Sequence, residues 1–168
     1  LIPISTANVA TVVRNASSLE MEGVELEAMV RFNEAWDMMV TYGYLSAEYA
    51  DYLADLTGSG EITDNSGLVP RNIPENTLGV TTSYTMQVGD GDLKARLSYR
   101  YRDDMETNSS NFPQGTLDSI TNLNATIAYS WSNYQATLWG RNLTDEREER
   151  WGTIGAITTR GWWNEPAT

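Results

Sequence analysis

The stretch that decides the fold class is residues 93–102, which reads LKARLSYRYR. Every second position is apolar or aromatic: Leu93, Ala95, Leu97, Tyr99 and Tyr101. The positions between them are polar or charged: Lys94, Arg96, Ser98, Arg100 and Arg102. Side chains alternate between the two faces of a β-strand, so this pattern predicts a strand with one apolar and one polar face.

The same period of two recurs along the chain. Alternating segments are predicted at 9–13, 22–32, 36–49, 77–87, 93–102, 123–131 and 134–141. The segment 36–49 changes phase near Leu45, for which we expect a β-bulge. Only the charged run 145–150 has any helical character. The chain is therefore predicted to be all-β, an antiparallel up-and-down meander of about seven strands.

The connections between these segments alternate in length. Short ones at 33–35, 89–92 and 132–133 alternate with long polar ones at 53–75, 103–119 and 144–166. In an antiparallel meander, all the short turns then lie at one end and all the long loops at the other. Outer-membrane barrels have this asymmetry, which predicts a section of a larger transmembrane β-barrel.

Composition excludes several classes of function. The chain has 168 residues with 11 basic and 23 acidic side chains, a net charge of -12 that should repel nucleic acid. It contains no Cys and no His, the commonest metal ligands and general bases. We predict no catalytic, cofactor or metal residues. Nine Tyr and six Trp against two Phe favour aromatic girdles at a bilayer surface.

The polar faces of the strands collect charges, which we expect to face the lumen and to pair between adjacent strands. These charges are Glu25, Glu27, Arg31, Lys94, Arg96, Arg100 and Arg141. Asp103, Asp104 and Glu106 are oxygen ligands of the kind that Ca²⁺ takes, but a solvated loop is the favoured interpretation. Residues 142–145, NLTD, are interpreted as a structural turn rather than a ligand site. Gly23 and Gly43 are expected to relieve crowding within strands.

Three segments resemble a known family. EGVELE at 22–27, NIPENTL at 72–78 and GRNLTDE at 140–146 are similar, in order and spacing, to motifs of TonB-dependent receptor barrels. The resemblance implies an outer-membrane receptor whose barrel of about 22 strands surrounds an N-terminal plug domain. It also implies contact with lipid and lipopolysaccharide, and coupling to the TonB complex. The implied cargo is a scarce ligand such as an iron-siderophore complex, cobalamin or a carbohydrate.

Residues 1–168 are expected to be a partial C-terminal barrel domain, without the plug and the final strand. Such an open sheet alone should aggregate or stay unfolded outside detergent. One alternative is a complete small barrel of eight strands. Another is a soluble β-sandwich that binds carbohydrate. A fragment of a β-rich glycosidase is a third.

Overall fold

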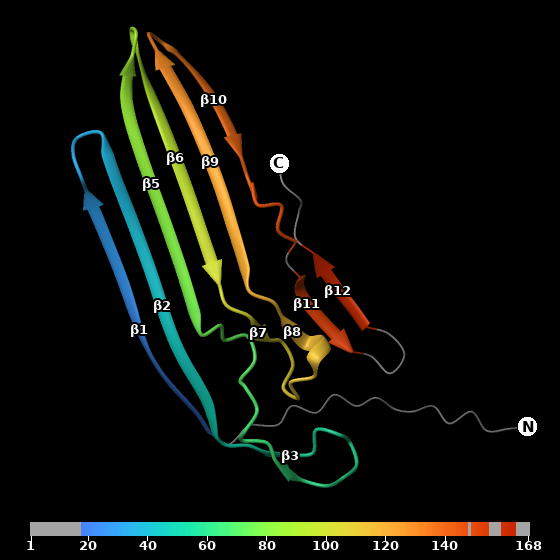
Figure 1. The fold of residues 1–168 in the computed structure, drawn as a ribbon. Coiled ribbons are helices and arrows are strands. Elements are labelled where there is room, and N and C mark those ends of the chain that lie inside the picture. The colour runs from blue at the N-terminus through green and yellow to red at the C-terminus, as the bar shows by residue number, and fades with distance from the viewer. Residues whose placement is uncertain (1–17, 148, 155–158, 164–168) are drawn as a thin grey trace, which may run out of the picture.

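The computed structural model describes residues 18–147, 149–154 and 159–163. Its main feature is one antiparallel sheet of six strands in the order β1-β2-β5-β6-β9-β10 (Figure 1). The strands are β1 (Ser18–Arg31), β2 (Trp36–Asp51), β5 (Asn76–Val88), β6 (Gly91–Arg102), β9 (Ile120–Trp131) and β10 (Tyr134–Gly140). Each long strand pairs with the next long strand along the chain, which confirms the predicted meander.

The long loops contain small sheets that the sequence did not indicate. β3 (Leu53–Ala54) pairs with β4 (Thr63–Asp64), and β7 (Met105–Glu106) with β8 (Thr116–Leu117). A 3₁₀ turn, η1 (Pro113–Gly115), precedes β8, while β11 (Glu149–Ile154) pairs with β12 (Thr159–Trp163). The charged run near 145 is thus not helical where it is described. β3, β4, β7 and β8 have two residues each, too few for alternation to show. β11 and β12, with six and five residues, show that the prediction of a loop throughout 144–166 is wrong.

The short connections gather at one end of the sheet, here called the turn end, and the long loops at the other, the loop end (Figure 1). At the turn end, the Asn33 side-chain oxygen accepts hydrogen bonds from the backbone N–H groups of Ala35 and Trp36, both at 2.9 Å. Gly89 has a φ of 60° in the β5–β6 turn, a conformation that glycine adopts without strain. The predicted sorting of connections by length is confirmed.

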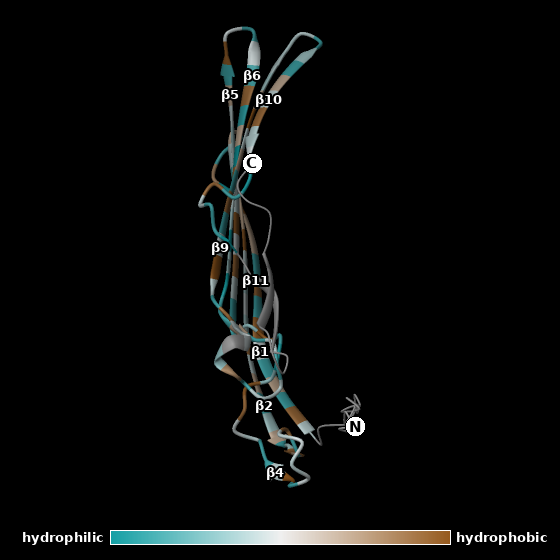
Figure 2. Cartoon of the chain, turned by 90° about the vertical axis from the view of Figure 1, so that its right-hand side faces the viewer, coloured by the Kyte–Doolittle hydropathy of each residue, from teal (hydrophilic) through white to brown (hydrophobic). Residues whose placement is uncertain are grey.

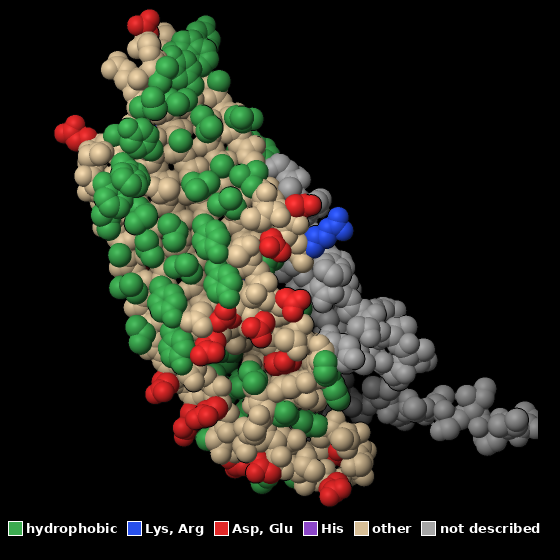
Figure 3. Space-filling model, viewed as in Figure 1, with side chains coloured by type: hydrophobic (Ala, Val, Ile, Leu, Met, Phe, Trp, Pro, Cys, Tyr) green, Lys and Arg blue, Asp and Glu red, His purple; other side chains and the backbone are tan. Residues whose placement is uncertain are grey.

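Over the part of the sheet that includes residues 24–31 of β1, register places most of the apolar residues on one face. One row of cross-strand neighbours is Ala28, Val40, Val80, Tyr99 and Leu123, and the next is Leu26, Tyr42, Leu78, Tyr101 and Thr121. We call this the apolar face. Figure 3 shows it covered by hydrophobic side chains, with acidic side chains gathered toward the loop end.

The sheet is a single layer. Figure 2 shows the strands edge-on, and in the part of the chain that the structure describes no second sheet covers either face of the six strands. Among the described residues the buried apolar side chains are Tyr52, Ala54 and Leu117, all at the loop end. None of the described residues forms a helix that is long and apolar enough to cross a bilayer. A sandwich would bury one face of each sheet against the other, so the soluble-sandwich alternative does not describe this chain.

Aromatic side chains mark both ends of the apolar face. At the turn end Phe32 stacks on Trp36 at 4.1 Å between ring centroids, and Trp131 lies 5.9 Å from Tyr134. At the loop end Tyr42 and Tyr101 face outward. Trp131 lies opposite Gly91, the first residue of β6, and Tyr101 lies ten residues farther along the same strand. This separation corresponds to roughly 33 Å along the strand. A strand tilted by about 40° then spans about 25 Å, the height of the apolar band in outer-membrane barrels.

The bulge expected near Leu45 is wrong. Pairing between β1 and β2 is unbroken from Leu19 opposite Tyr49 to Arg31 opposite Asp37, and the register shifts only between Ser18 and Leu19. The change of phase is therefore a change in which face is apolar, while the backbone continues. β1 also begins at Ser18 rather than near 22. The segment predicted at 9–13 lies outside the described residues.

We predict that arginine at two adjacent positions of β5 has different effects on the free energy of unfolding. Val80 lies on the apolar face and Thr81 on the other face, near the middle of the strand. In the full-length protein, Val80→Arg should lower the free energy of unfolding by about 2–4 kcal/mol, since a strand crossing a bilayer would then expose a cation to lipid. Thr81→Arg should change it little. Unfolding in lipid vesicles measures both, and equal losses would contradict the assignment of the faces.

Candidate functional site

The face opposite the apolar face carries the charged residues, and we call it the charged wall. Two rows of cross-strand neighbours run over it. The first is Glu27, Thr41, Gly79, Arg100 and Asn122. The second is Glu25, Gly43, Thr77, Arg102 and Ile120. Each row begins with a carboxylate on β1 and reaches a guanidinium on β6.

Small residues on β2 and β5 form the floor between these charges. A Cβ added at Gly43 would lie 2.9 Å from Thr77 Oγ1, and one at Gly79 would lie 2.5 Å from Thr41 Oγ1. Both glycines thus make room for the neighbouring threonines, as expected for Gly43. The result is a groove of about 910 Å³, lined at its sides by Glu25, Glu27, Arg100 and Arg102.

Charges of opposite sign in the groove do not lie on adjacent strands, contrary to our expectation. Three strand spacings separate β1 from β6, about 14 Å. The four cations on this face of β6, Lys94, Arg96, Arg100 and Arg102, have neutral cross-strand neighbours on β5 and β9. We call these four residues the cationic stripe. Lys94, Arg96 and Arg100 present positive charge to whatever lies inside the wall, while Arg102 donates to the backbone carbonyls of Asp103 and Asp118.

The other two predicted lumen cations lie apart from the groove. Arg31 is the cross-strand neighbour of Asp37 at the turn end. The guanidinium carbon of Arg141 lies 5.2 Å from the centre of the Trp139 ring, a cation–π arrangement. Neither residue lines the groove. The sequence pattern found the correct face for both, but it could not show whether they belong to the groove.

The NLTD turn has a structural role. Asn142 is buried, has a φ of 51°, and lies two residues after the end of β10 at Gly140. Its backbone N–H donates to Asn124 Oδ1 at 2.9 Å, its side-chain amide donates to the Glu146 carbonyl at 2.9 Å, and its Oδ1 accepts from the Glu146 N–H at 3.2 Å. One side chain thus fixes the exit from the last long strand. The geometry agrees with the structural interpretation of this motif.

Carboxylates at the loop end are also engaged within the chain. Asp103 accepts hydrogen bonds from the Tyr101 hydroxyl and from the Asn76 amide, the latter at 2.7 Å. The Tyr101 bond, followed by the Asn76 bond, holds the pKa of Asp103 below its usual value. Glu106 Oε1 accepts from the Thr116 hydroxyl at 2.8 Å. Within the described ranges, no group of three or more acidic side chains is arranged to hold a metal ion.

Asp55 organises the tip of the first long loop. Its Oδ2 accepts from the Gly60 N–H at 2.6 Å, and its Oδ1 accepts from the N–H groups of Thr57, Gly58 and Ser59. The Gly60 bond is the largest cause that lowers the pKa of Asp55. The carboxylate is therefore used to close the loop.

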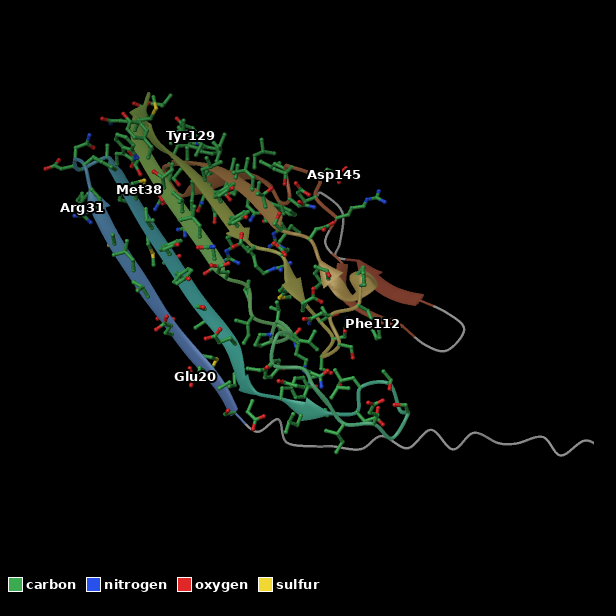
Figure 4. All side chains as sticks on the ribbon, turned by 60° about the horizontal axis from the view of Figure 1, so that its bottom comes forward. Glu20, Arg31, Met38, Phe112, Tyr129 and Asp145 are labelled. Atoms are coloured by element: carbon green, nitrogen blue, oxygen red, sulfur yellow. The ribbon has the colours of Figure 1, made fainter. Side chains whose placement is uncertain are left out.

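The first two long loops are joined by one asparagine, which the sequence patterns did not single out. Asn111 Oδ1 accepts from the Val69 N–H at 2.6 Å, and Asn111 Nδ2 donates to the Val69 carbonyl at 3.0 Å. The Asn72 N–H also donates to the Glu106 carbonyl at 2.6 Å. Figure 4 labels the adjacent Phe112 among the loops. We call the Asn111–Val69 pair the loop clasp. Because of it, the two loops form one surface.

For the NLTD turn, we predict that Asn142→Ala lowers the free energy of unfolding of the full-length protein by about 1–3 kcal/mol, because it removes the hydrogen bonds to the part-buried backbone N–H and C=O of Glu146. Asn133→Ala, in the exposed β9–β10 turn, is the matched control and should have little effect. Denaturant titration in lipid vesicles measures both. A loss at Asn133 as large as that at Asn142 would argue against this role.

For the loop clasp, we predict that Asn111→Ala accelerates hydrogen exchange at the Val69 amide by about tenfold, since it removes one hydrogen bond and loosens the contact between the loops. Ser109→Ala, in the same loop, serves as the control. Exchange followed by mass spectrometry in detergent resolves the two. An unchanged Val69 rate would show that the loops hold together without Asn111.

Comparisons with known proteins agree with this architecture. Residues 2–143 match the model of the TonB dependent receptor-like β-barrel family. The ferric yersiniabactin uptake receptor FyuA from Yersinia pestis superimposes with a TM-score of 0.76 at 18% identity, over 91% of this chain and 23% of that one. The siderophore receptor PiuA from Acinetobacter baumannii gives 0.68 at 21% identity, over 89% and 20%. No curated protein sequence matches the chain.

These structures share the fold of the chain, which spans less than a quarter of the length of either receptor. The family match covers the sheet and its first two long loops, which hold the charged wall and the loop clasp. The chain therefore belongs to the TonB-dependent receptor family and forms part of its β-barrel.

Proposed function

We propose that this chain is a section of an outer-membrane transporter that imports a scarce ligand. The observation that carries the proposal is the one-layer sheet with two unlike faces. An apolar face without a covering layer suits lipid, and a charged wall on the same strands suits a wet interior. The described residues provide binding surfaces, and the function that we propose for them is binding and release without a chemical reaction.

The proposed cargo is an iron-siderophore complex. The two structures named above are described as a ferric yersiniabactin uptake receptor and a siderophore receptor. Cobalamin and carbohydrates are the other cargo classes that the family resemblance suggested. Fold alone does not select among them. The joined loops at the loop end are the proposed place of first contact.

The charged wall is proposed to face the plug domain of the full-length receptor. A groove with carboxylates on β1 and the cationic stripe on β6 would accept a body that carries complementary charges. Removing such charges from water is favourable only when each finds a partner. Energy for moving the plug would come from the TonB complex, acting outside this chain.

Transport is tested by uptake of radioactive iron in cells that express the full-length receptor. We expect uptake of at least one of ferrichrome, ferrioxamine B and ferric enterobactin, and loss of that uptake when TonB is deleted. Replacing residues 105–117 by two glycines should also abolish uptake, because it removes β7, β8 and the loop clasp. Heat-modifiable electrophoretic mobility would check that the barrel still assembles.

Two results would contradict the proposal in different ways. Uptake that persists without TonB would overturn the transport mechanism. TonB-dependent uptake of cobalamin or a maltodextrin, without uptake of any ferric complex, would keep the mechanism and overturn the proposed cargo.

A further inference from the structure

The β5–β6 hairpin continues beyond the sheet as two arms that belong to the long loops. One arm, residues 69–76, runs into β5, and the other, residues 103–111, runs out of β6. Thr77 and Arg102 are the last cross-strand neighbours of the hairpin at the loop end. Beyond this pair three further contacts join the two arms, and we call these three contacts the loop ladder.

The contacts of the loop ladder follow one another outward from the sheet. At the inner contact the Asp103 N–H donates to the Asn76 carbonyl at 3.0 Å. At the middle contact the Asn72 N–H donates to the Glu106 carbonyl at 2.6 Å. The outer contact is the loop clasp. Both arms advance outward from each contact to the next, so the ladder continues the antiparallel pairing of β5 and β6.

The sequence of the arms explains why they form separate contacts and not a regular strand pair. Pro70 and Pro74 have no backbone N–H, so the arm 69–76 cannot donate a hydrogen bond at these positions. Asn72 has a φ of 60° and Asn111 has a φ of 48°, so each arm bends at a contact. The loop ladder therefore has few hydrogen bonds for its length.

The inner contact is well fixed to the sheet. The Asn76 side chain accepts a hydrogen bond from the Tyr42 hydroxyl and donates one to Asp103 Oδ2, both at 2.7 Å. The neighbouring residue Glu75 is bonded to β2, because its carbonyl accepts from the Leu45 N–H at 2.9 Å. Separating the arms here would thus break bonds to two other strands as well.

The outer contact has less support. One side chain, that of Asn111, makes both of its hydrogen bonds. Val69 is 53% exposed and the adjoining Phe112 is 51% exposed, so water reaches this contact. Local opening begins where buried contacts are few and hydrogen bonds are exposed. The loop ladder should therefore open first at the loop clasp.

We propose that the first two long loops open like a zipper, from the loop clasp through the middle contact to the inner contact, while β5 and β6 stay paired. The two loops are then one conformational unit with a fixed order of opening. The gap between them widens from its outer edge toward the sheet. This inference concerns the movement of the loops and does not rest on the proposed transport function or its cargo.

Hydrogen exchange tests the order, because each contact contains a backbone N–H that exchanges only after its contact opens. The three reporters are the amides of Val69, Asn72 and Asp103. In a zipper the two inner amides exchange only after the loop clasp has opened. Asn111→Ala should therefore accelerate all three amides by the same factor, about tenfold. Ser109→Ala should accelerate none of them.

Asn76→Ala is the reverse variant, because it weakens the inner contact and leaves the loop clasp intact. It should accelerate the Asp103 amide about tenfold and leave the other two reporters unchanged. The Asn65 N–H, which donates to the Tyr52 carbonyl at 2.8 Å elsewhere in the first loop, is the internal control and should respond to neither variant. Mass spectrometry with fragmentation to single residues measures the rates in the full-length protein in detergent.

Three results would overturn the inference. Acceleration of Val69 alone by Asn111→Ala would show that the contacts open independently. Acceleration of Val69 by Asn76→Ala, as large as that of Asp103, would show that the ladder has no order of opening. Acceleration of Asn65 by Asn111→Ala would show that the whole first loop has loosened and that the ladder is not a separate unit.

Discussion

A backbone N–H or C=O group without a partner in lipid costs several kcal/mol, and this constraint governs the rest of the structure. It requires long strands that bond to their neighbours along their whole length, as β5 does with β6 at twelve consecutive positions. With pairing fixed, alternation leaves two faces whose surroundings differ. The apolar face and the charged wall follow from that division, and neither needs a buried core.

The long strands were predictable because each has many residues over which a period of two can be seen. In residues 93–102 the alternation of side-chain type is enough to identify both faces of β6. Pairs such as β3–β4 and β7–β8 were not predictable, because two residues cannot show a period and their pairing depends on contacts distant in the chain. The loop clasp was not predicted either, because Asn111 and Val69 are far apart in sequence and their pairing depends on how the loops fold.

For the charged wall, sequence identified the face of each residue but not its neighbours. Which charges share a row depends on register, and register depends on the turns that join the strands. The predicted meander already placed two strands between Glu27 and Arg100, but whether these two residues share a row could not be read from the sequence. The phase change near Leu45 was detected correctly but assigned to the backbone. It instead reflects a change of surroundings along a regular strand.

The small sheets within the loops have an evolutionary consequence. β3–β4 and β7–β8 satisfy their own backbone hydrogen bonds, so sequence changes between them need not disturb the strands that cross the membrane. A chain whose loops carry their own strand pairs can therefore change the shape of its loop end while the register of its long strands stays the same.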